Sequence, residues 1–250
     1  MGIVALTALG VGGATVIGAL LGFLFKNASQ KISKILLSFA GGIMLSAAVF
    51  GLILPSLEYG DKFGILITVA GIFAGAFTLK LIDKFTPHLH KMIGEDIEEH
   101  KSSNLSKVLL FVIAIAIHNL PEGIAAGVGF GSGNDMDGIY IAIGIALQNI
   151  PEGMVIIAPM ISAGVSKKKT FLIASITGLI EVLGTFLGFF AVKIARVILP
   201  FALAFAGGTM LYVVSDEMIP ETHADGNKSG VTFSLLIGFC LMLVLDFFLG

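Results

Sequence analysis

Charge is scarce in this sequence: only 13% of its 250 residues are Asp, Glu, Lys or Arg, against about 25% in a typical soluble protein. Apolar residues make up 56% of the chain, and the mean hydropathy is +0.99. This composition excludes an ordinary soluble domain and predicts a membrane protein. The net charge of -2 argues against nucleic acid as a partner.

Cysteine is almost absent as well. The single cysteine, Cys240, lies in an apolar run, so the chain has neither a disulfide framework nor a thiolate metal site. The HExxH motif of zinc hydrolases is also missing. An intramembrane metallohydrolase is therefore the weakest functional hypothesis, and we expect that the chain is not an enzyme and uses no catalytic cofactor.

Long apolar runs take up most of the chain. A transmembrane helix needs about 20 mostly apolar residues, and the runs predict eight such helices in one all-α domain. They cover residues 2–25, 35–57, 63–82, 107–130, 138–161, 170–192, 197–215 and 231–249. Lysine and arginine gather in the loops after the first, third, fifth and seventh runs. These loops, including residues 83–106, are therefore predicted to face the cytoplasm, with both termini outside.

Two of the predicted spans share a sequence pattern. Residues 39–45 read FAGGIML and residues 205–211 read FAGGTML, and a proline and an acid follow in both cases. The two spans run in opposite directions under the predicted orientation, which suggests an inverted 3+2+3 repeat of the kind found in transporters. Two similar glycine-rich packing faces are the alternative. Close helix packing is also predicted at the glycine pairs Gly18/Gly22, Gly71/Gly75, Gly123/Gly127 and Gly184/Gly188.

Polar residues interrupt the two central spans at the same depth. The segment HNLPEG begins at His118, and the segment QNIPEG begins at Gln148. His118 and Glu122 are four residues apart and share one face of a helix. Gln148 and Glu152 repeat this spacing. Imidazole, carboxylate and amide ligands without thiolate suit zinc, iron(II), manganese or cobalt rather than magnesium or calcium.

A third acid, Glu181, lies near the middle of the sixth span. A charge at the bilayer centre costs at least about 2.5–3.5 kcal/mol on insertion scales, so three acids at one depth require a cation or protons to neutralise them. Asn119 and Asn149 follow one residue after the first ligands, about 100° around the helix. They are candidates for an adjacent second site with Glu181. A structural role fits any one of these residues alone but not the repeated pattern.

Two further clusters of acids and histidines lie towards the cytoplasm. The cluster at the end of the seventh span is a candidate exit site and consists of Asp216, Glu217, Glu221 and His223. The cluster in the loop of residues 83–106 is a candidate metal-binding, regulatory site and contains His88, His90 and His100. Ordinary solvated charge is the alternative for both clusters.

These motifs resemble those of the ZIP family of zinc and iron transporters, and of its prokaryotic GufA-like branch in particular. The similar segments are HNLPEG, QNIPEG, LIEVLG at residues 179–184 and SDEMIPETH at residues 215–223. The resemblance implies a ZIP-like fold and a binuclear site, with the first metal ion held by His118, Glu122, Gln148 and Glu152. The second ion would be held by Asn119, Asn149 and Glu181, with Glu152 bridging. The resemblance also implies a homodimer in the cell membrane and an elevator-like motion of one helix bundle.

We therefore expect the chain to take up zinc into the cytoplasm, with iron, manganese, cobalt and cadmium as further substrates. A metal-gated sensor or a divalent cation channel is the alternative, and proton-linked and passive transport both fit the sequence. Gln148 stands where several relatives carry histidine, and Asn149 where some carry aspartate. Both changes lower the charge or basicity of a ligand, which leaves the metal preference and the occupancy of the second site open.

Overall fold

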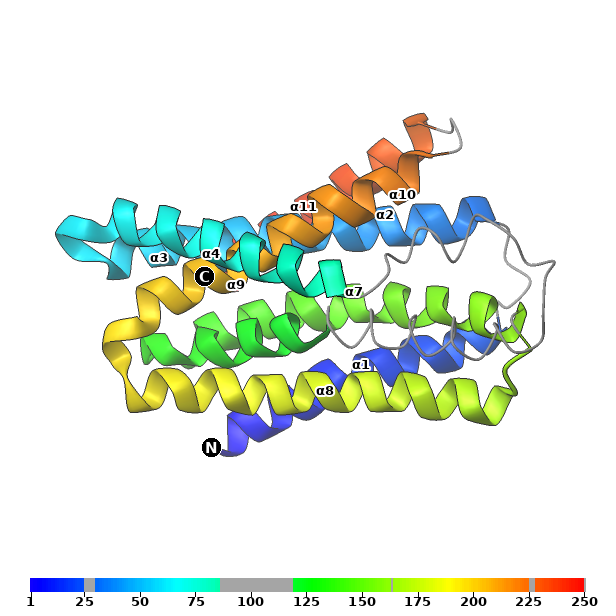
Figure 1. Cartoon of the computed structure of the whole chain (residues 1–250), viewed down its shortest axis with the longest axis horizontal. Helices are drawn as coiled ribbons and strands as arrows, with labels where there is room; N and C mark the ends of the chain where they lie inside the picture. Colours follow the sequence, from blue (N-terminus) through cyan, green and yellow to red (C-terminus); the bar gives the residue numbers. More distant parts are fainter. Residues whose placement is uncertain (25–29, 86–118, 163, 225–227, 250) are drawn as a thin grey trace.

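The polypeptide folds into helices. The computed structural model describes residues 1–24, 30–85, 119–162, 164–224 and 228–249 (Figure 1). Within this part of the chain the long helices are α1 (Gly2–Leu24), α2 (Gln30–Ser46), α4 (Gly64–Phe85), α7 (Asp135–Ser162), α8 (Lys167–Ile194), α9 (Leu199–Val213) and α11 (Lys228–Leu249). Residues 119–129 form one more helix. The described residues contain no strand, and the predicted all-α class is confirmed.

Seven helical stretches of the described residues are long and apolar enough to cross a membrane. They are Gly2–Leu24, Lys31–Tyr59, Gly64–Ile82, Asp135–Ala158, Lys167–Ile194, Arg196–His223 and Ser229–Phe248. These stretches correspond to every predicted span except the fourth, residues 107–130, whose first half lies outside the described residues. These helices fit the predicted protein that crosses the bilayer several times, and the count of eight stays a prediction.

Two of these stretches are each built from three consecutive helical pieces. In chain order the pieces are α2, the π-helix η1 (Ala47–Ile53) and α3 (Leu54–Tyr59), and then α9, the π-helix η5 (Val214–Met218) and α10 (Ile219–His223). Pro55 and Pro220 stand in the first turn of the short final helices. Because proline has no N–H to give to the preceding turn, the π segment before it lets the helix continue across the missing bond.

The helices sort into two bundles by their contacts. Helix α1 packs against α7 and α8, and the helix of residues 119–129 packs against α8 through its glycines. We call these four helices the site bundle. Helix α2 packs against α11, and α4 packs against α9; these, with α3 and α10, form the second bundle. Figure 1 shows α1, α7 and α8 on one side of the molecule and α2 and α4 on the other.

The glycine contacts inside the second bundle occur as two equivalent sets. At four glycines an added Cβ would overlap a backbone carbonyl oxygen of the facing helix: Gly42 on Leu235, Gly238 on Phe39, Gly208 on Ile72 and Gly75 on Phe205. Gly42 and Gly208 are the corresponding glycines of FAGGIML and FAGGTML. The pair α2 and α11 is thus the counterpart of the pair α9 and α4, which supports the predicted inverted repeat.

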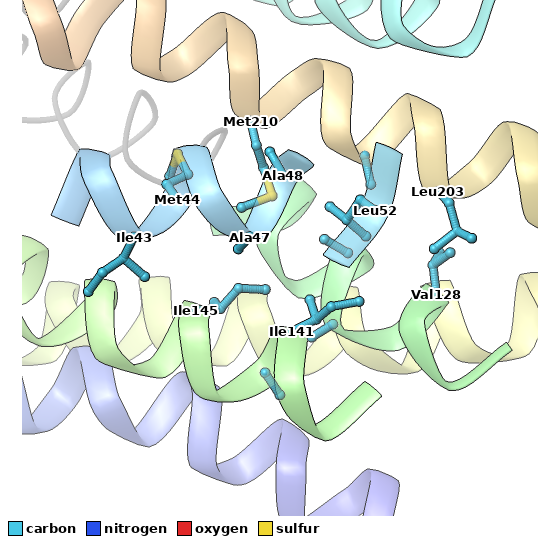
Figure 2. Packing of buried hydrophobic residues seen from close by; sticks show 14 of the residues in the cluster. Ile43, Met44, Ala47, Ala48, Leu52, Val128, Ile141, Ile145, Leu203 and Met210 are labelled. Carbon is cyan, nitrogen blue, oxygen red and sulfur yellow. The ribbon is translucent and has the colours of Figure 1, made fainter. Parts of the chain in front are cut away.

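The two bundles meet through apolar side chains. Ile43 and Ala47, from α2 and η1, belong to a buried cluster with Ile145 of α7 (Figure 2). Gly51 of η1 and Gly144 of α7 face across this interface, and each meets side-chain atoms rather than backbone. Contacts between the bundles are therefore softer than the backbone contacts within them, because flexible side chains can yield where a carbonyl oxygen cannot.

Candidate metal site

The polar residues predicted for the midplane come together inside the site bundle. The helix of residues 119–129 contributes two of them and α7 and α8 contribute the rest, namely Asn119, Glu122, Gln148, Asn149, Glu152 and Glu181. All are at most 4% exposed except Glu152, which is partly buried. His118 lies outside the described residues. Since burying a carboxylate or an amide is costly unless it is paired, the partners of these groups decide what the cluster does.

Glu181 is the centre of a hydrogen-bond network. The hydroxyl of Thr15 on α1 donates to Glu181 Oε1 at 2.8 Å, and Asn119 Nδ2 donates to the same oxygen. Asn149 Nδ2 donates to Glu181 Oε2 at 2.6 Å and also lies 3.2 Å from the backbone oxygen of Val11. One carboxylate therefore joins all four helices of the site bundle.

Glu122 has a different surrounding. Its Oε1 accepts a hydrogen bond from Gln148 Nε2 at 2.7 Å. Its Oε2 is buried without a partner among the described residues, and so are Gln148 Oε1 and Asn149 Oδ1. Glu152 interacts electrostatically with both Glu122 and Glu181. Buried acceptors without donors are costly, and a cation beside them would supply the missing partner.

Glycines allow the helices that carry these side chains to come close. At each of four glycines an added Cβ would overlap the backbone of the neighbouring helix: Gly123 on Glu181, Gly184 on Leu120, Gly153 on Thr15 and Gly18 on Ile150. The predicted close helix packing at Gly123 and at the other glycine pairs is therefore confirmed. In lipid, where no hydrophobic effect drives helices together, such contacts are a main source of association.

Thr15 is the residue of this cluster that the sequence analysis missed. A signal for it exists in the spacing: Thr15 stands three residues before Gly18, and Glu181 stands three residues before Gly184. The contacts correspond as well, because each of these glycines packs on the residue before the proline of one NxPEG motif. Thr15 and Glu181 thus occupy equivalent places on α1 and α8.

The acids and the histidine predicted to form an exit site do not gather as the midplane residues do. Asp216 and Glu217 lie in η5, and Glu221 and His223 lie in α10. The ring nitrogens of His223 lie 2.9 Å from the backbone oxygen of Ile219 and 3.3 Å from Thr232 Oγ1. Across the described residues, no three His, Cys, Asp or Glu side chains gather closely enough to hold a metal ion by themselves.

The exit site therefore stays a prediction. The histidines predicted to bind metal in the loop, His88, His90 and His100, lie outside the described residues. At the midplane, the described groups that could face an ion include amide oxygens as well as carboxylates.

Comparison with known proteins gives a consistent assignment. A family model described as ZIP Zinc transporter matches residues 93–246. The chain is 36% identical to the zinc transporter GufA of Myxococcus xanthus over 100% of both chains. It is 34% identical to the zinc transporter ZIPB of Bordetella bronchiseptica, over 95% of this chain and 78% of that one. It is also 36% identical to the zinc transporter ZupT of Chlorobaculum parvum, over 92% and 91%.

The resemblance inferred from HNLPEG and QNIPEG is thereby confirmed, and so is the expectation that the chain is not an enzyme. The match extends well beyond the two motifs, since the similarity to GufA spans all the helices of both bundles. The chain belongs to the ZIP zinc transporter family.

Proposed function

We propose that this chain carries zinc across the cell membrane into the cytoplasm, and that the ion crosses the bilayer through the polar cluster of the site bundle. Family membership and the names of its relatives support zinc as the substrate. One observation supports the place of binding: among the described residues, Glu122 Oε2 and Gln148 Oε1 are buried acceptors without a hydrogen-bond donor. A desolvated divalent cation would supply a partner to such oxygens.

In this proposal the first ion binds at His118, Glu122, Gln148 and Glu152. Gln148 gives its amide nitrogen to Glu122, so its amide oxygen is left as a neutral ligand. The carboxylates of Glu122 and Glu152 balance the charge of a divalent ion. This balance lowers the free-energy cost of holding the ion and the two carboxylates away from water. The imidazole favours zinc over magnesium and calcium, and iron, manganese, cobalt and cadmium are the further candidate substrates.

Movement of the site bundle against the second bundle would expose the ion to each side of the membrane in turn. Within the site bundle, glycines place backbone against backbone, and the Glu181 network joins all four helices. Between the bundles, glycines meet side-chain atoms such as the end of Met242. This difference supports a rigid carrier that slides as one body. The distribution of lysine and arginine supports the orientation, and the homodimer rests on the family resemblance alone.

Uptake of radioactive zinc into proteoliposomes tests this proposal. We expect Glu122→Gln and Glu152→Ala to lower the initial rate at least about tenfold, because each removes one of the two charges that offset the ion. Asp135→Asn is the matched control, since Asp135 is an exposed acid at the start of the same helix as Glu152. It should transport zinc at the rate of the unchanged protein.

Undiminished uptake by Glu152→Ala, or by the double variant His118→Ala, Glu122→Ala, would disprove the site assignment. Gel filtration and circular dichroism of each variant separate a lost site from a lost fold. Repeating the assay across a pH gradient distinguishes proton-linked transport, in which the gradient changes the rate, from passive transport.

A further inference from the structure

The hydrogen bond between Thr15 and Glu181 joins equivalent places of two helices. A carboxylate on α8 faces a hydroxyl on α1, and the glycines that follow each of them make corresponding contacts. On either side, the asparagines of the two NxPEG motifs also donate to Glu181. The surroundings of Glu181 are therefore nearly symmetric, and the donors come from both halves of the site.

This network uses both oxygens of Glu181. Oε1 accepts from Thr15 and Asn119, and Oε2 accepts from Asn149. A hydrogen bond to a charged group is among the stronger interactions in a buried site. A metal ion at Glu181 would compete with these N–H and O–H groups, which fill three of the about four acceptor directions of the carboxylate. By contrast, Glu122 Oε2 has no partner within the described part of the chain.

Thr15 is the donor least able to leave. An asparagine can rotate its amide and turn its oxygen, in place of its nitrogen, toward an ion. Rotation of the Thr15 side chain would instead replace the hydroxyl by a methyl group or a hydrogen, and neither is a metal ligand. The backbone around Thr15 is fixed as well, since Gly153 of α7 packs on its carbonyl oxygen and Gly12, one turn earlier, packs on Gly178 of α8. The backbone of Thr15 therefore cannot move away from Glu181 unless α1 separates from both helices.

We propose that Thr15 is a positioning residue that holds Glu181 as a structural anchor of the site bundle, so that the midplane carries one zinc ion at a time. The inference rests on the proposed function, because it takes zinc as the cargo. It departs from the binuclear site expected from the family resemblance. In this chain the second ion competes with a hydroxyl and two amides for a single carboxylate.

Equilibrium dialysis of the full-length protein in detergent, over a range of free zinc, tests the inference. The unchanged protein should bind one zinc ion at the midplane, with any second ion much weaker. Thr15→Val keeps the shape of the side chain and removes the hydroxyl. We expect it to bind the second ion at least about tenfold more tightly, the size of effect that follows from loss of one hydrogen bond to a charged group. Thr15→Ser, which restores the hydroxyl, should return to the unchanged behaviour.

Equal second-ion affinity in Thr15→Val and the unchanged protein would overturn the inference, as would a Thr15→Ser variant that binds like Thr15→Val. Two equally tight ions in the unchanged protein would do the same. If Thr15→Val does not fold, the smaller Thr15→Ala carries the same loss of the hydroxyl and decides the question. The proposed function fails separately, through undiminished uptake in the Glu122 and Glu152 variants.

Discussion

Gly12 of α1 and Gly178 of α8 lie against each other, and a Cβ added to either glycine would overlap the carbonyl oxygen of the other. No side chain separates the two helices at this point, which lies one turn from the Thr15–Glu181 hydrogen bond. The close approach of α1 and α8, and with it the geometry of that hydrogen bond, therefore depends on both residues being glycine.

Replacing Gly178 with alanine should destabilise the protein. Because the added methyl meets a backbone oxygen that cannot rotate away, we expect a loss of about 1–3 kcal/mol in the free energy of unfolding, seen as a lower midpoint of thermal unfolding in detergent. Gly13→Ala is the control, since Gly13 is on the same helix as Gly12 and has nothing within 4 Å of an added Cβ. Equal midpoints for the two variants would contradict this account of the contact.

Removal of the Gln148 amide should abolish stabilisation by zinc. In Gln148→Leu, Glu122 loses its one described donor and the site loses a neutral oxygen ligand. Zinc at one hundred times its dissociation constant stabilises a native protein by about 2.7 kcal/mol. We therefore expect zinc to raise the midpoint of thermal unfolding in the unchanged protein and to leave it nearly unchanged in the variant. A full zinc-induced rise in Gln148→Leu would show that Gln148 is not a ligand.

The gathering of these polar side chains was largely predictable from the sequence, because acids and amides are costly in lipid and are seldom retained in a span without a function. Glu122 and Gln148 lie in two similar motifs at the same predicted depth, and both are buried in the cluster. Thr15 gives no such signal, since a threonine in a helix can satisfy its hydroxyl on its own backbone. Thr185 does so by donating to the carbonyl oxygen of Glu181 at 2.9 Å. Only the facing helix distinguishes the two threonines.

The ends of the helices were harder to predict from the sequence. The apolar run of the seventh span ends at residue 215, but the helical stretch continues to His223 through a π segment. Apolar periodicity reports what faces lipid and not where backbone hydrogen bonds stop. A proline such as Pro220 is a probable helix boundary in a sequence, yet one π turn is enough to accommodate it. The π segment before Pro55 accommodates that proline in the same way.

The second bundle has a buried hydrogen-bond network of its own. Loss of this network should lower the stability of the protein and leave zinc transport unchanged. Ser56 is fully buried, and its hydroxyl lies 2.7 Å from both Thr68 Oγ1 and the backbone oxygen of Pro200. Ser56→Ala removes both of these buried hydrogen bonds, so we expect a loss of about 1–3 kcal/mol in the free energy of unfolding. The KM for zinc should not change, because none of these residues lies in the site bundle.

Ser175→Ala is the matched control for Ser56. Where the chain is described, the Ser175 hydroxyl bonds only to the backbone oxygen of Phe171, one turn earlier in its own helix. Chemical denaturation in detergent should show a much smaller effect for this variant. A KM for zinc that shifts as much in Ser56→Ala as in Glu122→Gln would argue that the second bundle also contributes to the site.

A covalent link between the bundles should stop transport if the bundles move relative to each other. The Tyr59 hydroxyl, at the end of α3, lies 3.4 Å from Asp137 Oδ2 of α7. Cysteines at these two positions, in a background with Cys240→Ser, can be joined by a reagent that carries two thiol-reactive ends and a reducible linker. We expect linking to lower zinc uptake at least about tenfold, because the site bundle can then no longer slide, and a reductant to restore it.

The control link lies within the site bundle. Asn134 Nδ2 donates to Asp137 Oδ1 at 2.7 Å, so cysteines at positions 134 and 137 join two neighbouring points of one bundle. That link should leave uptake unchanged. Full transport by the protein linked between positions 59 and 137 would exclude sliding of the bundles and favour a channel through a fixed pathway.

Anomalous X-ray diffraction at the zinc absorption edge, from crystals of the full-length protein grown with zinc, tests the central claim most directly. The account predicts one strong peak in the site bundle, within bonding distance of Glu122, Gln148 and Glu152, and none bonded to Glu181. A map whose midplane shows no peak, with zinc only at the acids of α10 or in the loops, would contradict the assignment of the transport site.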